Sequence, residues 1–240
     1  MTSCAIFIPA YNAAKTIGSV LERIPEAFWP TVAQVIVIND GSTDDTDAVV
    51  RALAERFPKV RLVSQPTNRG YGAAVRRGLR LCLETGADFV VCLHADGQYP
   101  PEKLPEFVPF MAAHGVDVLQ GSRHKDGTAR AGGMPRYKVI SGHLLTWLEN
   151  RTFGLQMTDY HSGFMLYSRR AVETIPFDGL STYFDFDLEV IASARARGLV
   201  VAELGIPTRY GDEESHLNPI WYGLRCLRVM ARYRLGRYAG

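Results

Sequence analysis

Residues 88–98 read Asp-Phe-Val-Val-Cys-Leu-His-Ala-Asp-Gly-Gln, a short apolar run that passes directly into a polar turn. The run 88–93 has the length and the β-branched and aromatic content of a strand buried on both faces. The turn after it carries His94, Asp96 and Gln98. The same order, a buried strand and then a polar turn, recurs along the chain and predicts the fold.

Other apolar runs alternate with stretches that have helical spacing. Strands are expected at 4–8, 34–38, 60–64, 88–93, 117–120, 163–167 and 200–204, and helices at 15–28, 46–57, 72–84, 101–113, 137–149, 184–197 and 219–235. Apolar strands separated by helices indicate a mostly parallel sheet with helices on both faces. Right-handed crossovers make this a doubly wound α/β fold. We expect a single domain, with 1–216 as its body and 217–240 as a C-terminal basic amphipathic helix of the same domain.

The bulk composition fits a packed globular chain. Of 240 residues, 47% are hydrophobic and 22% are charged. The net charge of +2 is too small to indicate nucleic acid as a partner. The cysteines form no CxxC pair and no zinc-ligand spacing, which favours reduced core residues: Cys4, Cys82, Cys92 and Cys226. No signal peptide and no apolar run of about 20 residues is seen, so a cytoplasmic location is expected, with any membrane contact peripheral and on the inner face.

Polar turns follow each of the first five predicted strands. Because ligands bind beyond the carboxyl ends of such strands, these turns predict one binding edge. The turns are Pro9-Ala10-Tyr11-Asn12, Asn39-Asp40-Gly41-Ser42-Thr43-Asp44, Asn68-Arg69-Gly70-Tyr71-Gly72, His94-Ala95-Asp96-Gly97-Gln98 and Gly121-Ser122-Arg123.

Asp96 is the candidate metal ligand at this edge. A carboxylate beside a diphosphate would repel it unless a divalent cation bridges the two. Gly97 permits a sharp turn that directs Gln98 back toward the metal. Taken alone, Asp96 is equally well interpreted as an ordinary turn residue at a strand end.

Taken together, these strings resemble family 2 glycosyltransferases, especially the dolichol-phosphate mannose synthase-like branch. The match extends over residues 4–216 and includes Ala95-Asp96-Gly97-Gln98-Tyr99-Pro100-Pro101-Glu102 and Asp159-Tyr160-His161-Ser162-Gly163-Phe164. The resemblance implies a GT-A fold, a UDP- or GDP-linked sugar as donor and Mg²⁺ or Mn²⁺ as cofactor. It implies a polyprenyl phosphate or another lipid or glycan as acceptor, and a small soluble acceptor stays open.

The resemblance also implies roles for individual residues. Asp96 and Gln98 would hold the metal, with His94 as a further candidate ligand. The nucleotide sugar would lie against Pro9, Ala10, Tyr11, Asn12, Asp40, Gly70, Gly72, His94, Ala95, Asp96 and Arg123. The Asp40 carboxylate can accept a hydrogen bond from an N–H group of the nucleobase, and the planar guanidinium of Arg123 can donate two hydrogen bonds to a phosphate.

Two positions depart from the family pattern. His94 stands where the family has the first Asp of Asp-x-Asp, so it ligates the metal, contacts ribose or has no role. Near the C-terminus, Arg209, a further candidate ligand for acceptor phosphate, is followed by a loop one residue longer than the family's, with His216 in place of Lys. His216 is either a ligand for phosphate, acceptor or metal, or an ordinary exposed loop histidine.

A catalytic base is needed if the acceptor is a hydroxyl. Asp159 is the favoured candidate and Asp187 the second, while Asp185 and Glu189 share a different helix face from Asp187. A phosphate acceptor needs no base, and Arg123, Arg130 and Arg136 would then be its ligands.

The last helix has two stripes. Arg225, Arg228 and Arg232 form a basic one, and Ile220, Leu224, Leu227 and Ala231 an apolar one. The pattern is typical of a helix on anionic lipid, or of a core-packed helix with a solvated arginine face.

Two other enzyme classes are excluded, and one alternative stays open. Gly70-Tyr71-Gly72 does not continue as a dinucleotide-binding fingerprint, because the third glycine position is Val75. A sugar nucleotidylyltransferase would need a glycine-rich first loop, where Pro9-Ala10-Tyr11-Asn12 stands instead. A non-catalytic module that binds nucleotide sugar, or a scaffold in a glycan pathway, remains the alternative because of His94.

Overall fold

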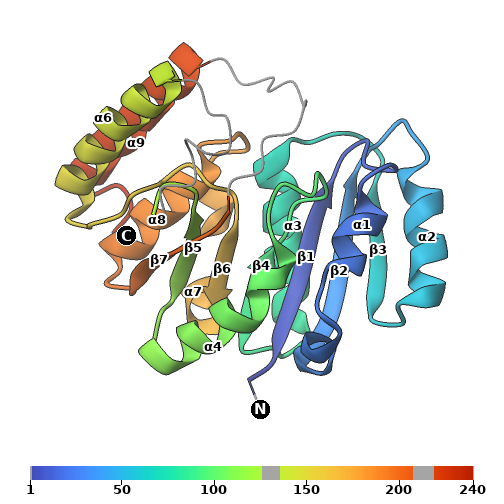
Figure 1. Cartoon of the computed structure of the whole chain (residues 1–240). Coiled ribbons are helices and arrows are strands. Elements are labelled where there is room, and N and C mark those ends of the chain that lie inside the picture. The colour runs from blue at the N-terminus through green and yellow to red at the C-terminus, as the bar shows by residue number, and fades with distance from the viewer. Residues whose placement is uncertain (1, 126–135, 208–218, 240) are drawn as a thin grey trace.

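The computed structural model describes residues 2–125, 136–207 and 219–239. A seven-stranded sheet runs through them in the order β3-β2-β1-β4-β6-β5-β7 (Figure 1). Its strands are β1 (Cys4–Ala10), β2 (Val32–Asp40), β3 (Val60–Gln65), β4 (Phe89–Cys92), β5 (Val118–Ser122), β6 (Met165–Ser168) and β7 (Val201–Gly205). Only β6 is antiparallel to its neighbours β4 and β5. The predicted mostly parallel α/β sheet is confirmed.

Helices connect these strands. They are α1 (Ile17–Glu22), α2 (Thr46–Arg56), α3 (Tyr71–Glu84), α4 (Leu104–His114), α6 (Arg136–Phe153), α7 (Arg169–Thr174), α8 (Phe186–Ala196) and α9 (Pro219–Arg234). The helix expected at 15–28 is wrong beyond Glu22, because Pro25 disfavours helical backbone at Ile24 and a separate 3-10 helix follows at Glu26–Thr31. The six-residue α7 was not predicted, because it is too short to show a helical period.

Both faces of the sheet are buried, as an apolar parallel strand requires. Along β1, Ala5 and Phe7 face one core, which contains residues of α3 and α8. Cys4, Ile6 and Ile8 face the other, which contains residues of α1, α2 and α4. This alternation with a period of two explains why the strands read as continuous apolar runs.

Helices α6 and α9 lie side by side at one end of the molecule (Figure 1). The sequence-based interpretation of α9 needs correction here. Arg225 and Arg232 do not form a solvated or lipid-facing stripe, because they pair with the buried Asp185, just before α8, and Glu189, in α8, at 2.9 and 2.7 Å. The apolar stripe is turned outward instead, with Leu224 and Leu227 51% and 49% exposed.

Within the described residues, no helix is both long enough and apolar enough to cross a bilayer. All four cysteines are free thiols and buried, as the sequence predicted.

Candidate active site

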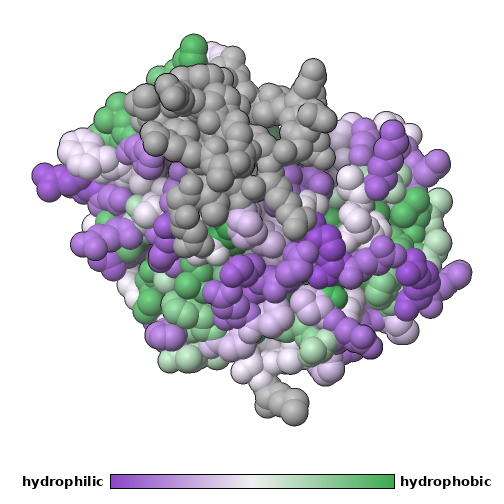
Figure 2. Space-filling view, in the orientation of Figure 1, coloured by the Kyte–Doolittle hydropathy of each residue, from purple (hydrophilic) through white to green (hydrophobic). Residues whose placement is uncertain are grey.

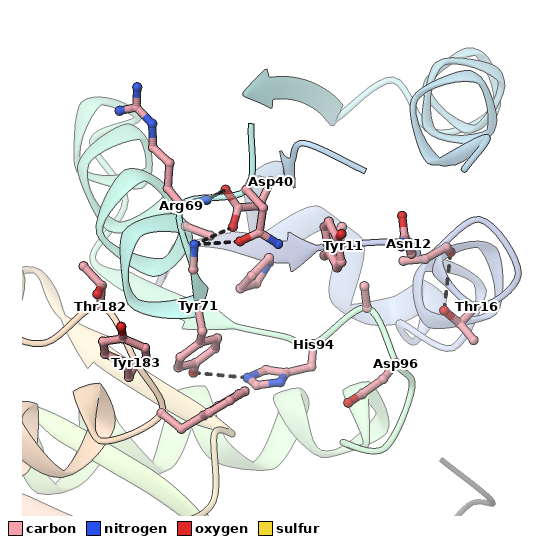
Figure 3. Close-up of a pocket in the computed structure, with 18 of the residues that line it drawn as sticks. Tyr11, Asn12, Thr16, Asp40, Arg69, Tyr71, His94, Asp96, Thr182 and Tyr183 are labelled. Atoms are coloured by element: carbon pink, nitrogen blue, oxygen red, sulfur yellow. Dashed lines mark hydrogen bonds between the residues drawn. The ribbon is translucent and has the colours of Figure 1, made fainter. Parts of the chain in front are cut away.

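A cavity of about 920 Å³ opens where β1, β2 and β4 end (Figure 3). It brings together nine of the predicted donor-site residues: Pro9, Ala10, Tyr11, Asn12, Asp40, Gly70, His94, Ala95 and Asp96. Tyr11 is half exposed there, so its ring offers an accessible flat face. Lys15, Thr16 and the segment 182–184 also line the cavity, and no sequence motif marks them. Tyr71 lines it too, and it stands in the string Asn68-Arg69-Gly70-Tyr71-Gly72 without an expected role of its own.

Asp40 shapes one wall of the cavity. Its carboxylate accepts hydrogen bonds from the backbone N–H groups of Arg69 and Gly70, at 2.9 and 3.0 Å, and from the side chain of Gln65 at 3.1 Å. Gly70 has a φ of +89°, a backbone conformation that favours glycine. The carboxylate therefore fixes the 69–70 turn, in addition to any contact it makes with a ligand.

Asn12 joins the turn after β1 to the turn after β2. Its side-chain oxygen accepts from the backbone N–H of Thr43 at 2.9 Å, and its own N–H donates to the Ser42 hydroxyl at 2.9 Å. Asn12 has a φ of +51°, which asparagine tolerates better than most residues. The two turns therefore form one rigid rim of the cavity.

Asp96 caps the tight turn after β4. Its carboxylate accepts from the backbone N–H of Gln98 at 3.0 Å, and Gly97 has a φ of +75°. Arg23 of α1's C-terminal end holds this turn by donating to the carbonyl of Gly97 at 2.7 Å, and it pairs with Glu102 at 2.8 Å. Sequence reasoning missed Arg23, because no motif marks a residue that acts on a turn 74 positions away.

His94 belongs to a chain of hydrogen bonds that starts inside the protein. The Tyr71 hydroxyl donates to Asp187 at 2.9 Å and lies 3.3 Å from Nε2 of His94 (Figure 3). Burial lowers the pKa of His94 despite the nearby Asp96, which favours the neutral ring. Burial also raises the pKa of Asp187 to about 7, although Tyr71 opposes this.

Two glycines permit close packing beside this chain. A Cβ atom on Gly163 would lie 2.6 Å from the His94 ring. A Cβ atom on Gly72 would lie 2.5 Å from the carbonyl oxygen of Ser181. Gly72 thus packs against the 181–182 backbone and is not among the residues that line the cavity.

Arg123 and Asp159 form a separate pair beyond β5. The guanidinium lies 3.2 Å from the buried carboxylate and also donates to the His161 carbonyl at 3.1 Å. Burial alone would raise the pKa of Asp159, but the charges of Arg123 and His161 lower it overall. Neither Arg123 nor Asp159 lines the donor cavity. Asp159 is therefore a weak proton acceptor in this arrangement.

Asp185, Asp187 and Glu189 point in the two directions that their spacing predicted. Asp187 faces Tyr71, while Asp185 and Glu189 face the arginines of α9. Of the proposed acceptor ligands, Arg130, Arg209 and His216 lie outside the described residues. Arg136 begins α6, and its side chain also lies outside them.

The end of β4 carries three side chains of types that a divalent cation accepts as ligands. A carboxylate, a neutral imidazole and an amide come from Asp96, His94 and Gln98 within five residues of one turn, and His94 and Asp96 both line the cavity. Carboxylate and amide oxygens are ligands of Mg²⁺ and Mn²⁺, and an imidazole shifts the preference toward the softer of these.

Comparison with known proteins agrees with this geometry. The model of the glycosyl transferase family 2 matches residues 5–175. A dolichyl-phosphate β-glucosyltransferase of Trichomonas vaginalis is 29% identical over 88% of this chain, which spans 65% of that relative's length. An undecaprenyl-phosphate mannosyltransferase of Micrococcus luteus is 29% identical, and the match covers 83% of this chain and 80% of that relative's length.

A solved structure shares the fold. Glucosyl-3-phosphoglycerate synthase of Mycobacterium tuberculosis, crystallised with Mn²⁺, UDP and phosphoglyceric acid, superposes with a TM-score of 0.68 at 22% identity. The match covers 99% of this chain and 78% of the synthase. The predicted GT-A fold is thereby confirmed.

Proposed function

Because this chain belongs to glycosyl transferase family 2, we propose that it transfers a hexose from a UDP- or GDP-sugar to a polyprenyl phosphate or another lipid or glycan acceptor. The observation that carries the proposal is the cavity at the ends of β1, β2 and β4, which gathers Tyr11, Asp40, His94 and Asp96 from three separate motifs.

The donor is proposed to bind along the rim from β2 to β4. Tyr11 and Asp40 would hold the base and ribose, since one offers an exposed ring and the other a carboxylate acceptor. The diphosphate would lie near His94 and Asp96, with Lys15, which also lines the cavity, to offset its charge.

Asp96 and Gln98, with His94, would hold Mg²⁺ or Mn²⁺. When bound, the cation supplies positive charge next to the leaving diphosphate. The protein's own contribution is to fix these ligands: Arg23 holds the 97–99 turn, and Tyr71 orients the His94 ring.

The need for a base depends on the acceptor. An acceptor phosphate is already an anion, so Arg123 would bind it and no proton need be removed. A hydroxyl acceptor would need a base, and Asp159 and Asp187 are the candidates. The pKa of Asp187, about 7, lies near the working pH, but its carboxylate is buried against Tyr71 and, like Asp159, is not among the residues that line the cavity. Asp159 also holds Arg123 in place.

A lipid acceptor requires contact with a membrane surface. Leu144 and Trp147 of α6 and Leu224 and Leu227 of α9 are half to two-thirds exposed. Figure 2 shows hydrophobic residues at the upper left, over the end where α6 and α9 lie. We propose that this surface rests on the cytoplasmic face of a membrane.

A transfer assay tests the proposal. The chain would be incubated with UDP-glucose, UDP-N-acetylglucosamine or GDP-mannose, with Mn²⁺ or Mg²⁺, and with undecaprenyl or dolichyl phosphate in mixed micelles. Formation of a glycosylated lipid phosphate with one donor, lost in Asp96→Ala, would support it.

The alternative is a non-catalytic module that binds nucleotide sugar. His94 in place of aspartate favours it, because imidazole is a poorer ligand for Mg²⁺ than carboxylate. Such a module would bind UDP or GDP but release no diphosphate with any metal or acceptor. If the chain is such a module, His94→Asp is expected to create turnover that the wild type lacks. If the chain is an active enzyme, the wild type itself turns over and there is no activity to restore.

A further inference from the structure

Three metal-ligating side chains from distant parts of the chain converge outside the donor cavity. Glu149 comes from α6, His161 from the segment before β6, and Cys226 from α9. The potential ligand atoms of the three residues all lie within 4.8 Å of one another. The cluster lies where α6 and α9 pack together (Figure 1).

Within the described part of the chain, the buried carboxylate of this cluster makes no hydrogen bond, and its one ion-pair partner is His161. Glu149 is fully buried, and neither of its carboxylate oxygens makes a hydrogen bond among the described residues. Nε2 of His161 lies 3.3 Å from the carboxylate, but the two are not oriented as a hydrogen bond. Burial raises the pKa of Glu149, although His161 partly opposes the shift. A carboxylate buried in this way destabilises the fold unless a positive charge accompanies it. That charge is either a protonated His161, whose pKa burial lowers but the Glu149 carboxylate raises overall, or a bound metal ion.

The ring of His161 is held in the orientation that a metal ligand needs. Its Nδ1 lies 2.9 Å from the Tyr222 hydroxyl, and its backbone N–H donates to Asp159 at 2.8 Å. With its proton on Nδ1, the ring presents the Nε2 lone pair to Glu149 and Cys226. Ligating histidines are commonly fixed by such a hydrogen bond at the other ring nitrogen.

We propose that Glu149, His161 and Cys226 form a zinc site, distinct from the cation site at Asp96. The oxygen, nitrogen and sulfur donors are the set that Zn²⁺ takes, whereas Mg²⁺ and Mn²⁺ avoid thiolate. A tetrahedral zinc ion holds its ligand atoms about 3.3–3.5 Å apart. The Glu149–His161 separation of 3.3 Å already matches this, and the thiol, which lies no more than 4.8 Å from the other two ligand atoms, would move closer by at most about 1.5 Å.

The zinc ion would tie α6 and α9 to the segment that carries Asp159. Binding displaces the thiol proton of Cys226 to solvent, so that thiolate, carboxylate and neutral imidazole complete three of four positions, with water at the fourth. Because His161 contacts both Asp159 and Arg123 through its backbone, the ion would stiffen the region around that pair.

Zinc content of the untagged, full-length chain tests the proposal. The chain is loaded with zinc chloride, dialysed, and measured by plasma mass spectrometry, and cobalt is substituted to look for a thiolate-to-cobalt charge-transfer band. We expect about one tightly bound zinc per chain. Zinc and the cobalt band should be lost in Cys226→Ser and in Glu149→Gln. Glutamine has nearly the same shape as glutamate, so the second variant removes the charge with little change in packing.

Matched controls separate this site from other effects. Cys82→Ser alters another buried thiol and Asp96→Ala alters the donor-site cation, and both should retain zinc. Circular dichroism of each variant shows whether it is folded. Wild-type chain without zinc after loading would overturn the proposal, as would folded Glu149→Gln with full zinc and an unchanged cobalt band.

Discussion

The Asp187 carboxyl is buried, and the Tyr71 hydroxyl is its hydrogen-bond donor. Its other oxygen has no hydrogen-bond partner among the described residues. A low-polarity setting of this kind disfavours the charged form and leaves the group protonated up to about neutral pH. The titration of one residue therefore reports on both the stability of the fold and the chemistry available next to His94.

The first prediction concerns stability against pH. The pKa of Asp187 rises from 3.8 to about 7 on folding, so the folded chain binds more protons between these values. Stability from this group is therefore greatest at acidic pH and lost as pH rises through about 7. Asp187→Asn should reduce the difference in unfolding free energy between pH 5 and pH 8 by about 2–3 kcal/mol, measured by urea denaturation. An unchanged difference would contradict the raised pKa.

The second prediction concerns Asp40. Asp40→Ala removes the acceptor for two backbone N–H groups and the proposed contact with the base. We expect about a tenfold or greater loss of UDP or GDP affinity by calorimetry, even without metal, because each hydrogen bond to a charged group contributes about 1.5–3 kcal/mol. The exposed Asp178 provides a control, and Asp178→Ala should bind normally. Equal affinity in Asp40→Ala and wild type would refute the role.

Some of these residues could be found from sequence and others could not. Tyr11, Asp40, His94 and Asp96 stand directly after predicted strands, so the shared edge of a parallel sheet places them together. Arg23 could not be found, since its contact with Gly97 depends on how α1 packs. Tyr71 stood in a recognised string, but only the fold reveals its contacts with Asp187 and His94.

At the scale of elements, α9 supports one wall of the donor cavity. Arg225 pairs with Asp185 at 2.9 Å, donates to the Ser181 hydroxyl at 2.9 Å and lies over the Tyr183 ring at 4.4 Å. Tyr183 and its neighbours at 182 and 184 line the cavity. A helix near the C-terminus thus positions a loop at the donor site.

The third prediction follows from that contact. Arg225→Ala should loosen the 182–184 wall and raise the KM for the donor about tenfold, because a partly buried ion pair and a cation–π contact are lost together. Arg228→Ala provides the matched control, since this arginine lies on the same helix and is exposed. Donor KM measured at saturating acceptor would distinguish the two. A similar KM in both variants would contradict the support role.

Element positions were predictable where a period was long enough to read. The strands and the helices α2, α3, α8 and α9 begin and end within a few residues of expectation. The orientation of α9 was not predictable, because its basic stripe and its apolar stripe both have helical spacing. The sequence of α9 does not show which of the two stripes faces the buried carboxylates. Asp185 and Glu189 decide that question, and they lie more than 30 residues earlier.

At the scale of the whole molecule, the exposed apolar residues of α6 and α9 lie together at one end of the molecule. The fourth prediction is that a double substitution, Leu224→Glu with Leu227→Glu, reduces binding to phosphatidylglycerol vesicles in cosedimentation. Each leucine that is exposed in the free protein and buried in lipid on docking contributes about 1.5–3 kcal/mol to the free energy of membrane binding, and the substitutions remove this contribution. Val200→Glu, at an exposed site outside α6 and α9, should bind as wild type does. Equal sedimentation of all three proteins would contradict membrane docking through this end.

The central claim is that the cavity binds a nucleotide diphosphate together with a divalent cation held by Asp96. Calorimetric titration of UDP and GDP, with and without Mn²⁺, into wild type and Asp96→Ala tests it most directly. We predict that Mn²⁺ increases the affinity of wild type for one nucleotide by about tenfold or more, and that Asp96→Ala loses this increase. Metal-dependent binding that persists unchanged in Asp96→Ala, or no nucleotide binding at all, would contradict the account.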